Sequence, residues 1–92
     1  VALRVVVELD GGAVRVDGSE RMVSIVVDPA YRGHGYGLLL LNELSERVPG
    51  RLLAVVHELN APSVSLFTRA GYSLVGQHGV WRHYELEERK QN

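Results

Sequence analysis

Residues 23–37 read VSIVVDPAYRGHGYG, and this stretch decides the fold. It begins as a nearly continuous apolar run, which is typical of a strand covered on both faces. Asp28-Pro29 ends that strand, because proline has no N–H to donate to the ladder. Three glycines within five residues then lead directly into a helical pattern. The stretch therefore predicts a strand, a glycine-rich loop and a helix N-terminus in succession.

The loop at Arg32–Gly37 has the features of an anion-binding cradle. Its glycines leave little side-chain bulk, so that backbone N–H groups can approach a ligand closely. It opens into a helix N-terminus, where unpaired N–H groups and the helix dipole favour an anion. Arg32 adds a guanidinium that can bind phosphate oxygens in a fork. The alternative is a glycine-rich turn beside a solvated arginine.

Two common phosphate-binding motifs do not fit this loop. A P-loop ends in Gly-Lys-Ser/Thr, whereas Gly37 is followed by Leu38. A Gly-x-Gly-x-x-Gly dinucleotide fingerprint would need a glycine at position 38 or 40, and both positions are leucine. That fingerprint also belongs in a parallel sheet, whereas this strand follows two antiparallel hairpins.

The flanking sequence predicts the other elements. Alternating apolar residues indicate strands, and leucines at three- and four-residue steps, ending at Pro49-Gly50, indicate an amphipathic helix. Asn60 and Gly71 are typical of the cap positions of a second helix. The expected order is β-β-β-α-β-α-β-β, an α+β fold with helices on a mixed, mostly antiparallel sheet. The predicted ranges are strands 3–9, 13–16 and 22–27, a helix from 35–37 to 48, a strand 52–56, a helix 60–69, and strands 72–75 and 80–86.

Length and composition narrow the class of protein. Ninety-two residues predict one small domain, residues 1–92. A net charge of −1, with 10 basic residues, argues against nucleic acid as the main partner. No cysteine is present, which excludes disulfides and a thiol nucleophile, and no apolar run is long enough for a membrane span. We expect a cytoplasmic protein. Because the chain begins with Val1, it is either processed or a piece of a longer protein.

Two motifs together resemble the GNAT N-acetyltransferase superfamily. Arg32-x-x-Gly35-x-Gly37, after a valine-rich strand, resembles its acetyl-CoA-binding motif. Residues 56–72, VHELNAPSVSLFTRAGY, resemble its later strand and helix, Val-x-x-x-Asn…Ser/Ala…Leu-Tyr/Phe-x-x-x-Gly-Phe/Tyr. The resemblance covers roughly residues 20–86. It implies direct transfer of an acetyl group from acetyl-CoA to a primary amine.

The resemblance also implies how the coenzyme would lie. The strands at 22–27 and 52–56 would splay, with the pantetheine arm in the gap and the pyrophosphate on the N–H groups of residues 32–38. A backbone N–H near Val26 or Val27 would polarise the thioester carbonyl. The residues implied to bind the coenzyme are Ile25, Val26, Val27, Arg32, Gly33, His34, Gly35, Tyr36, Gly37, Leu38, Asn60, Ser63 and Phe67.

Two departures from the family pattern affect the chemistry. The family's tyrosine, which protonates the departing thiolate, is matched here by Phe67. Either Ser63 or a water replaces it, or the thiolate, which is a good leaving group, departs without an acid. The family also supplies one strand and two helices before the hairpin at residues 3–16. Without them, we expect either a shortened member or an acceptor site completed by a partner chain, a second copy or a missing N-terminal part.

The candidate bases follow the strand at 52–56. His57 and Glu58 lie near the expected acetyl position, and histidine titrates near neutral pH; the alternative is that both are ordinary loop residues. No histidine has metal-ligand spacing, so we predict no metal site. Trp81 and Tyr84, on the last strand, either pack on the sheet or form an acceptor platform.

The acceptor and the role of the chain are left open by the sequence. The acceptor is a small-molecule amine or a protein amine, and the Asn60…Ser63…Phe67 pattern is similar to GNAT domains that act on amino-sugar nucleotides. Two other functions compete with catalysis. One is a non-catalytic CoA-binding regulatory module, and the other is an accessory or dimerisation domain of a larger enzyme.

Overall fold

The elements follow the predicted order. The structure is a computed structural model that describes residues 3–87. The described elements are β1 (Arg4–Leu9), β2 (Gly12–Asp17), β3 (Met22–Val27), α1 (Tyr36–Arg47), β4 (Leu52–His57), α2 (Ala61–Arg69), β5 (Ser73–His78) and β6 (Trp81–Leu86), with a short 3-10 helix at Pro29–Tyr31 between β3 and α1.

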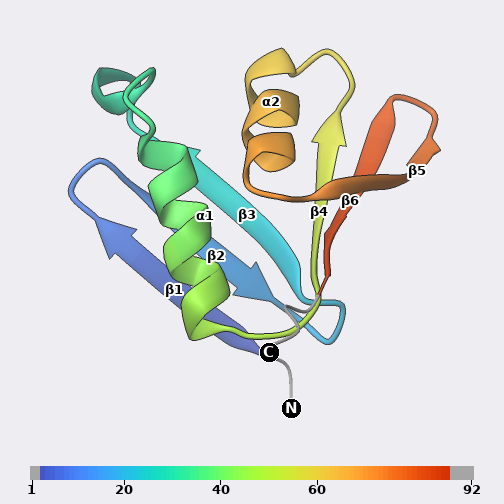
Figure 1. Ribbon diagram of the computed structural model, residues 1–92, viewed down its shortest axis with the longest axis horizontal. Coiled ribbons are helices and arrows are strands. Elements are labelled where there is room, and N and C mark those ends of the chain that lie inside the picture. Colours follow the sequence, from blue (N-terminus) through green and yellow to red (C-terminus); the bar gives the residue numbers. More distant parts are fainter. Residues whose placement is uncertain (1–2, 88–92) are drawn as a thin grey trace.

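All six strands form one sheet, in the order β1-β2-β3-β4-β6-β5 (Figure 1). Neighbouring strands are antiparallel except β3 and β4, which are parallel. The predicted α+β fold with a mixed, mostly antiparallel sheet is therefore confirmed.

The sheet opens between its two parallel strands. β3 and β4 share a single register pair, Met22 with Leu53, and the N–H of Leu53 donates to the carbonyl of Arg21 at 3.0 Å. Beyond this point the strands diverge toward their C-terminal ends, as Figure 1 shows. The predicted splay is confirmed, and it leaves strand backbone on both sides of the gap without a ladder partner.

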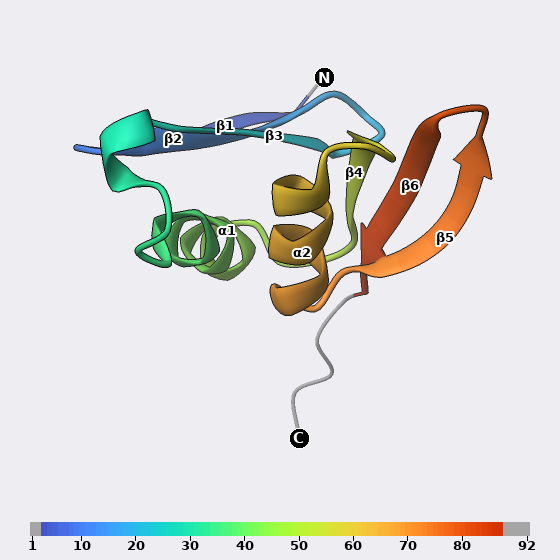
Figure 2. The same cartoon turned by 90° about the horizontal axis from the view of Figure 1, so that it is seen from above.

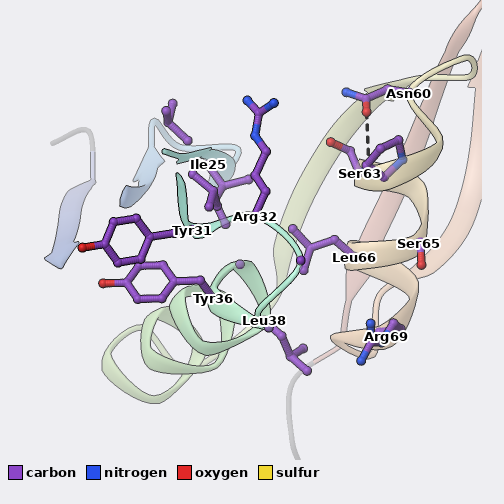
Figure 3. A pocket seen from close by; sticks show the side chains of 16 residues that line it. Ile25, Tyr31, Arg32, Tyr36, Leu38, Asn60, Ser63, Ser65, Leu66 and Arg69 are labelled. Carbon is purple, nitrogen blue, oxygen red and sulfur yellow. Dashed lines mark hydrogen bonds between the residues drawn. The ribbon is translucent and has the colours of Figure 1, made fainter. Parts of the chain in front are cut away.

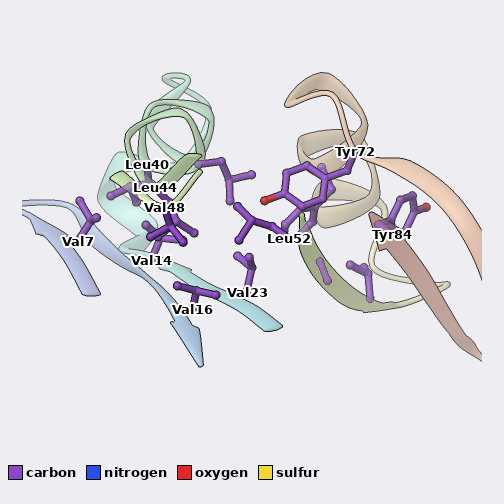
Figure 4. Packing of buried hydrophobic residues seen from close by; sticks show 14 residues of the cluster. Val7, Val14, Val16, Val23, Leu40, Leu44, Val48, Leu52, Tyr72 and Tyr84 are labelled. Carbon is purple, nitrogen blue, oxygen red and sulfur yellow. The ribbon is translucent and has the colours of Figure 1, made fainter. Parts of the chain in front are cut away.

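Both helices cover the same face of the sheet (Figure 2). Leucines of α1 point onto β1–β3, where they meet alternate valines in a continuous core (Figure 4). Because strand side chains alternate between faces, only every second strand residue enters this core. The side chains that are almost completely buried are Leu40, Leu41, Leu44, Leu52, Val7, Val14 and Val16.

The opposite face of the sheet carries no helix in residues 3–87 (Figure 2). The side chains that alternate with the core positions point to this face, among them Val6 and Val26. Val26 is 70% exposed. Only one side of the sheet is therefore built into the core of the described part.

The last hairpin differs from the prediction. β5 continues to His78 rather than ending at Val75, and Gly76 pairs with His83 across a register shift. The two-residue turn Gly79-Val80 is long enough to connect β5 to β6, because Gly79 takes the positive φ of 60° that such a tight turn needs. The shift at Val75 absorbs one extra residue, as a β-bulge does.

The predicted caps of α2 are confirmed. Asn60 Oδ1 accepts the N–H of Ser63 at 3.2 Å, and Gly71 takes a positive φ of 95° just after the helix. Neither α1 nor α2 has the length and apolar composition that a membrane-spanning helix needs, and they are the only α-helices in residues 3–87.

Candidate functional site

An open groove of about 980 Å³ lies between the start of α1 and α2 (Figure 3). One wall is formed by the end of β3 and the loop that follows it. The other wall is a stripe of α2 at three-residue steps, Asn60, Ser63, Leu66 and Arg69. The groove therefore brings the two motifs found in the sequence face to face.

The loop wall presents uncommitted backbone donors. Gly33 and Gly35 have φ values of 81° and 74°. Apart from the adjacent residues, no atom of residues 3–87 lies within 4 Å of where a Cβ would stand at either position. Gly35 caps α1 without a side-chain hydrogen bond. In the part of the chain that the structure describes, the N–H groups of residues 33–38 donate no hydrogen bond. Six N–H groups at a helix start form a site for an anion.

The charge of the groove agrees with an anionic ligand. Arg32 lines it from the loop and Arg69 from α2, and among residues 3–87 no carboxylate is part of the lining. Neither arginine forms an ion pair with residues 3–87. The two guanidinium groups are therefore available to a ligand.

The turn between β1 and β2 braces the loop. Tyr36 Oη accepts the N–H of Gly11 at 2.9 Å, and the carbonyl of Gly11 accepts the N–H of Asp28 at 2.7 Å. The ring of Tyr31 packs 5.0 Å from that of Tyr36 and fills the space where Gly11 would carry a Cβ. A glycine is needed at position 11 because the tyrosine ring stands there.

Every second residue of β3 directs its backbone N–H and C=O groups toward the gap. The N–H of Asp28 points to β2, where it donates to Gly11, and the carbonyl of Arg21 points to β4. Since the N–H and C=O groups alternate sides along a strand, those of Ile25 and Val27 face the gap and those of Val26 face β2. Of the two residues predicted to polarise a carbonyl, Val27 has the N–H on the correct side.

The start of α1 approaches α2 closely. A Cβ at Gly37 would lie 2.9 Å from Leu66 Cδ2, so a larger residue would have to displace the Leu66 side chain. The third glycine of the motif thus leaves room for Leu66, whereas Gly33 and Gly35 set the path of the loop.

The two candidate bases project from opposite faces of the sheet. His57 alternates with the buried Val56 and stands on the open face, where its ring meets that of Trp81 edge-on at 5.1 Å. Glu58 Oε2 accepts from Gln77 Nε2 at 2.8 Å, and Gln77 lies on the helix-bearing face. Neither residue lines the groove.

The hydrogen bonds distinguish the two candidates further. His57 Nδ1 accepts the N–H of Leu59 at 3.1 Å, which leaves the proton of a neutral imidazole on Nε2. The Nδ1 lone pair, which would have to take up the proton, already accepts this hydrogen bond. Glu58 keeps further lone pairs on its carboxylate, and of the three catalytic candidates only Ser63 lines the groove.

The structure brings most of the predicted coenzyme-binding residues together. His34 and Phe67 are the exceptions: neither lines the groove, and Phe67 is 4% exposed and packs edge-on against Tyr72 in the core. The predicted residues that line the groove are Ile25, Val26, Val27, Arg32, Gly33, Gly35, Tyr36, Gly37, Leu38, Asn60 and Ser63.

Sequence reasoning missed five lining residues, Tyr31, Pro62, Ser65, Leu66 and Arg69. Leu66 and Arg69 continue the three-residue step that starts at Asn60, so the helical spacing would have identified them. Tyr31 carried no such signal, because the short 3-10 helix that orients it was not predicted.

The remaining aromatic and histidine residues lie outside the groove. Tyr84 is 3% exposed and packs in the core, whereas Trp81 is 49% exposed on the open face. The rings of His78 and His83 are 5.0 Å apart. No group of three or more possible metal ligands is assembled within residues 3–87.

Comparison with known proteins identifies the fold. The family model described as Acetyltransferase (GNAT) family matches residues 11–72, more than half of the chain. No curated protein matches significantly. Among solved structures, yncA from Salmonella typhimurium, solved with its cofactor acetyl-CoA, has a TM-score of 0.75 and 22% identity over 88% of this chain and 60% of its own.

Two further solved structures resemble the chain. Nourseothricin acetyltransferase has a TM-score of 0.68 and 27% identity, covering 86% of this chain and 58% of its own. Spermidine N-acetyltransferase from Vibrio cholerae, in complex with CoA and spermine, has a TM-score of 0.70 and 15% identity, covering 85% and 58%.

The chain spans about three fifths of the length of these structures. The likeness to the Salmonella and Vibrio proteins, at such low identity, concerns the fold alone. Those two proteins were solved with acetyl-CoA and with CoA, respectively. From the family match and the groove at the predicted loop, we conclude that the chain belongs to the GNAT acetyltransferase family.

Proposed function

We propose that the protein binds acetyl-CoA in this groove and transfers the acetyl group to a primary amine. The observation that carries the proposal is the row of N–H groups at residues 33–38, which have no acceptor within residues 3–87. They open onto a groove that, in this part of the chain, is lined by two arginines and no carboxylate. Membership of the GNAT family supports the same reading.

The residues present fit the coenzyme along its length. The N–H groups of residues 33–38 and the guanidinium of Arg32 would hold the pyrophosphate. The gap-facing backbone of Ile25 and Val27 would bind the amides of the pantetheine arm as an added strand does. Asn60 and Ser63 would line its other side. Acetyl-CoA, when bound, supplies the acetyl group as a reactive thioester.

The transfer requires one bond to form and one to break. The amine nitrogen attacks the thioester carbonyl, the C–N bond forms, and the C–S bond breaks with the electron pair going to sulfur. The N–H of Val27 would donate to the carbonyl oxygen, where negative charge grows. The hydroxyl of Ser63, or a water beside it, would give a proton to the departing sulfur, since Phe67 has none to give.

The amine must lose a proton, and we propose Glu58 rather than His57 as the base. Glu58 lies on the helix-bearing face with α2, and its carboxylate has lone pairs beyond the one that accepts from Gln77. His57 stands on the other face with Nδ1 engaged by Leu59. Because Glu58 does not line the groove, a water between it and the amine would carry the proton.

The proposed acceptor is an amine. The solved complex with spermine supports an amine acceptor for that protein. For this chain we propose that the acceptor is a small amine, such as an amino sugar, or a protein amine. We also propose that a second copy or a partner chain completes the acceptor site, and that the protein works in the cytoplasm.

The positions of Phe67 and of the candidate bases favour a second function. Phe67 is buried in the core and neither candidate base lines the groove. A protein that binds CoA as a regulatory or accessory module would need the cradle and none of these catalytic groups. Binding without turnover would distinguish this function from catalysis.

The test is acetyl transfer to a panel of amines, followed as release of the free thiol. Replacing Glu58 with Gln keeps an oxygen for Gln77 and removes the base. We expect E58Q to lower kcat/KM by about 100-fold at neutral pH, while acetyl-CoA affinity is unchanged.

His57→Ala is the matched control and should retain most of the activity. Full activity in E58Q would show that Glu58 is not the base. Binding of acetyl-CoA with no thiol release for any amine would favour the regulatory module instead.

A further inference from the structure

Arg69 occupies one end of the groove. It is in the last turn of α2, on the same stripe as Asn60 and Leu66, and Figure 3 shows it at the opposite end of the helix from Asn60. Arg69 is nine positions after the N-cap Asn60, which corresponds to about 13 Å along the helix axis. The stripe therefore spans the groove from end to end.

The groove presents its binding groups in a fixed order. The gap between β3 and β4 lies at the Asn60 end, the N–H groups of residues 33–38 lie in the middle, and Arg69 lies at the end where Leu38 is also found (Figure 3). Coenzyme A has the same order: a thiol arm, a pyrophosphate, and a ribose that carries a separate phosphate at its 3′ position.

The two cations of the groove are separated. Arg32 belongs to the loop and Arg69 to the opposite wall, and in Figure 3 their guanidinium groups point to different ends of the site. They are the charged side chains that line the groove within residues 3–87. Two separated guanidinium groups suit a ligand with two separated anionic groups better than one with a single pyrophosphate.

Building on the proposed function, we propose that Arg69 binds the 3′-phosphate of coenzyme A and selects this coenzyme over dephospho-CoA. A phosphate monoester carries about −1.5 to −2 charges at pH 7 and offers three acceptor oxygens. The planar guanidinium can bind two of them at once. The pyrophosphate remains in dephospho-CoA, so the loop would contribute equally to both ligands.

A purely structural role predicts a different outcome. A basic residue in the last turn of a helix interacts favourably with the helix dipole, and Arg69 would do so without any ligand. Arg47 is in the same position in α1, does not line the groove, and lies 3.8 Å from Glu43. It is therefore a matched control for the effect of the dipole.

The experiment measures the dissociation constants of CoA and dephospho-CoA by calorimetry for the wild type, R69Q, R69K and R47Q. We expect the wild type to prefer CoA and R69Q to bind it about three- to tenfold more weakly, with dephospho-CoA unchanged. R69K should keep part of the preference and R47Q all of it. The preference should weaken as salt is raised, because Arg69 is exposed.

Several results would overturn the assignment. Arg69 does not recognise the 3′-phosphate if the wild type binds CoA and dephospho-CoA equally well. The same conclusion follows if R69Q loses affinity for both ligands equally, or loses none for CoA. In each of these cases the proposed function would stand. Failure of the wild type to bind either ligand would remove the proposed function, and this assignment with it.

Discussion

At the scale of single residues, neighbouring side chains of one helix belong either to the groove or to the core. Arg32 and Arg69 face the groove, whereas Phe67, one position along the same helix from Leu66, is turned into the core. Its neighbour Tyr72 is 3% exposed and carries a buried hydroxyl with no hydrogen-bond partner in residues 3–87. A buried hydroxyl without a hydrogen bond lowers the free energy of unfolding.

The Tyr72 hydroxyl gives a stability prediction at neutral pH. Tyr72→Phe removes the unpaired group and keeps the edge-on contact with Phe67, whose ring centroid is 5.0 Å away. We expect the free energy of unfolding to stay the same or rise by up to about 1 kcal/mol at pH 7. Urea unfolding of the two proteins measures the difference, and a marked loss of stability would mean that the hydroxyl has a partner.

The same residue gives a prediction for alkaline pH. Burial raises the pKa of Tyr72 from 10.0 to about 12. Between these values the unfolded chain releases this proton and the folded chain keeps it, so stability that is fully present below pH 10 is lost as the pH rises toward 12. The difference in melting temperature between Y72F and the wild type should therefore widen above pH 10. A constant difference would contradict the raised pKa.

At the scale of elements, the groove depends on a contact between a hairpin turn and the loop. The turn at Gly11 touches the loop through Tyr31 and Tyr36, both of which line the groove. The sequence predicted the turn and the loop separately. It carried no signal for the contact between them, because the residues are 25 positions apart and the pairing depends on the packed sheet.

We expect Gly11→Ala to weaken both the fold and the site. The added methyl group occupies the place of the Tyr31 ring, so the ring and the loop must shift. This should cost about 1–2 kcal/mol of stability and lower the affinity for CoA. Gly76→Ala is the matched control, because Gly76 has no atom within 4 Å of the added Cβ. Equal CoA affinity in both variants would show that the turn does not brace the loop.

Helix spacing and caps made the elements predictable, and long-range geometry limited the rest. Asn60, Gly71 and Pro49-Gly50 marked the helix ends, and the loop motif located one wall of the groove. The other wall was found only to Ser63, because the three-residue spacing along the helix was not extended to Leu66 and Arg69. The end of β5 was placed too early, since Gly76 reads as a turn residue but pairs with His83.

At the scale of the whole molecule, the divergence of β3 from β4 determines where the groove lies. The sheet is continuous at Met22 and Leu53 and open at the C-terminal ends of both strands, and α1 and α2 stand on the same face beside the opening. The sequence motif indicated this arrangement through family resemblance. Composition and periodicity alone predicted only a mixed sheet with helices.

Thermal unfolding with and without acetyl-CoA or CoA would test whether this groove binds the coenzyme. Ligand at 100 times its dissociation constant should add about 2.7 kcal/mol, which for a domain of this size raises the melting temperature by on the order of 10 °C. Arg32→Ala should reduce the shift at a fixed ligand concentration, and Arg47→Ala should leave it intact. No shift in folded wild-type protein at saturating ligand would contradict the account.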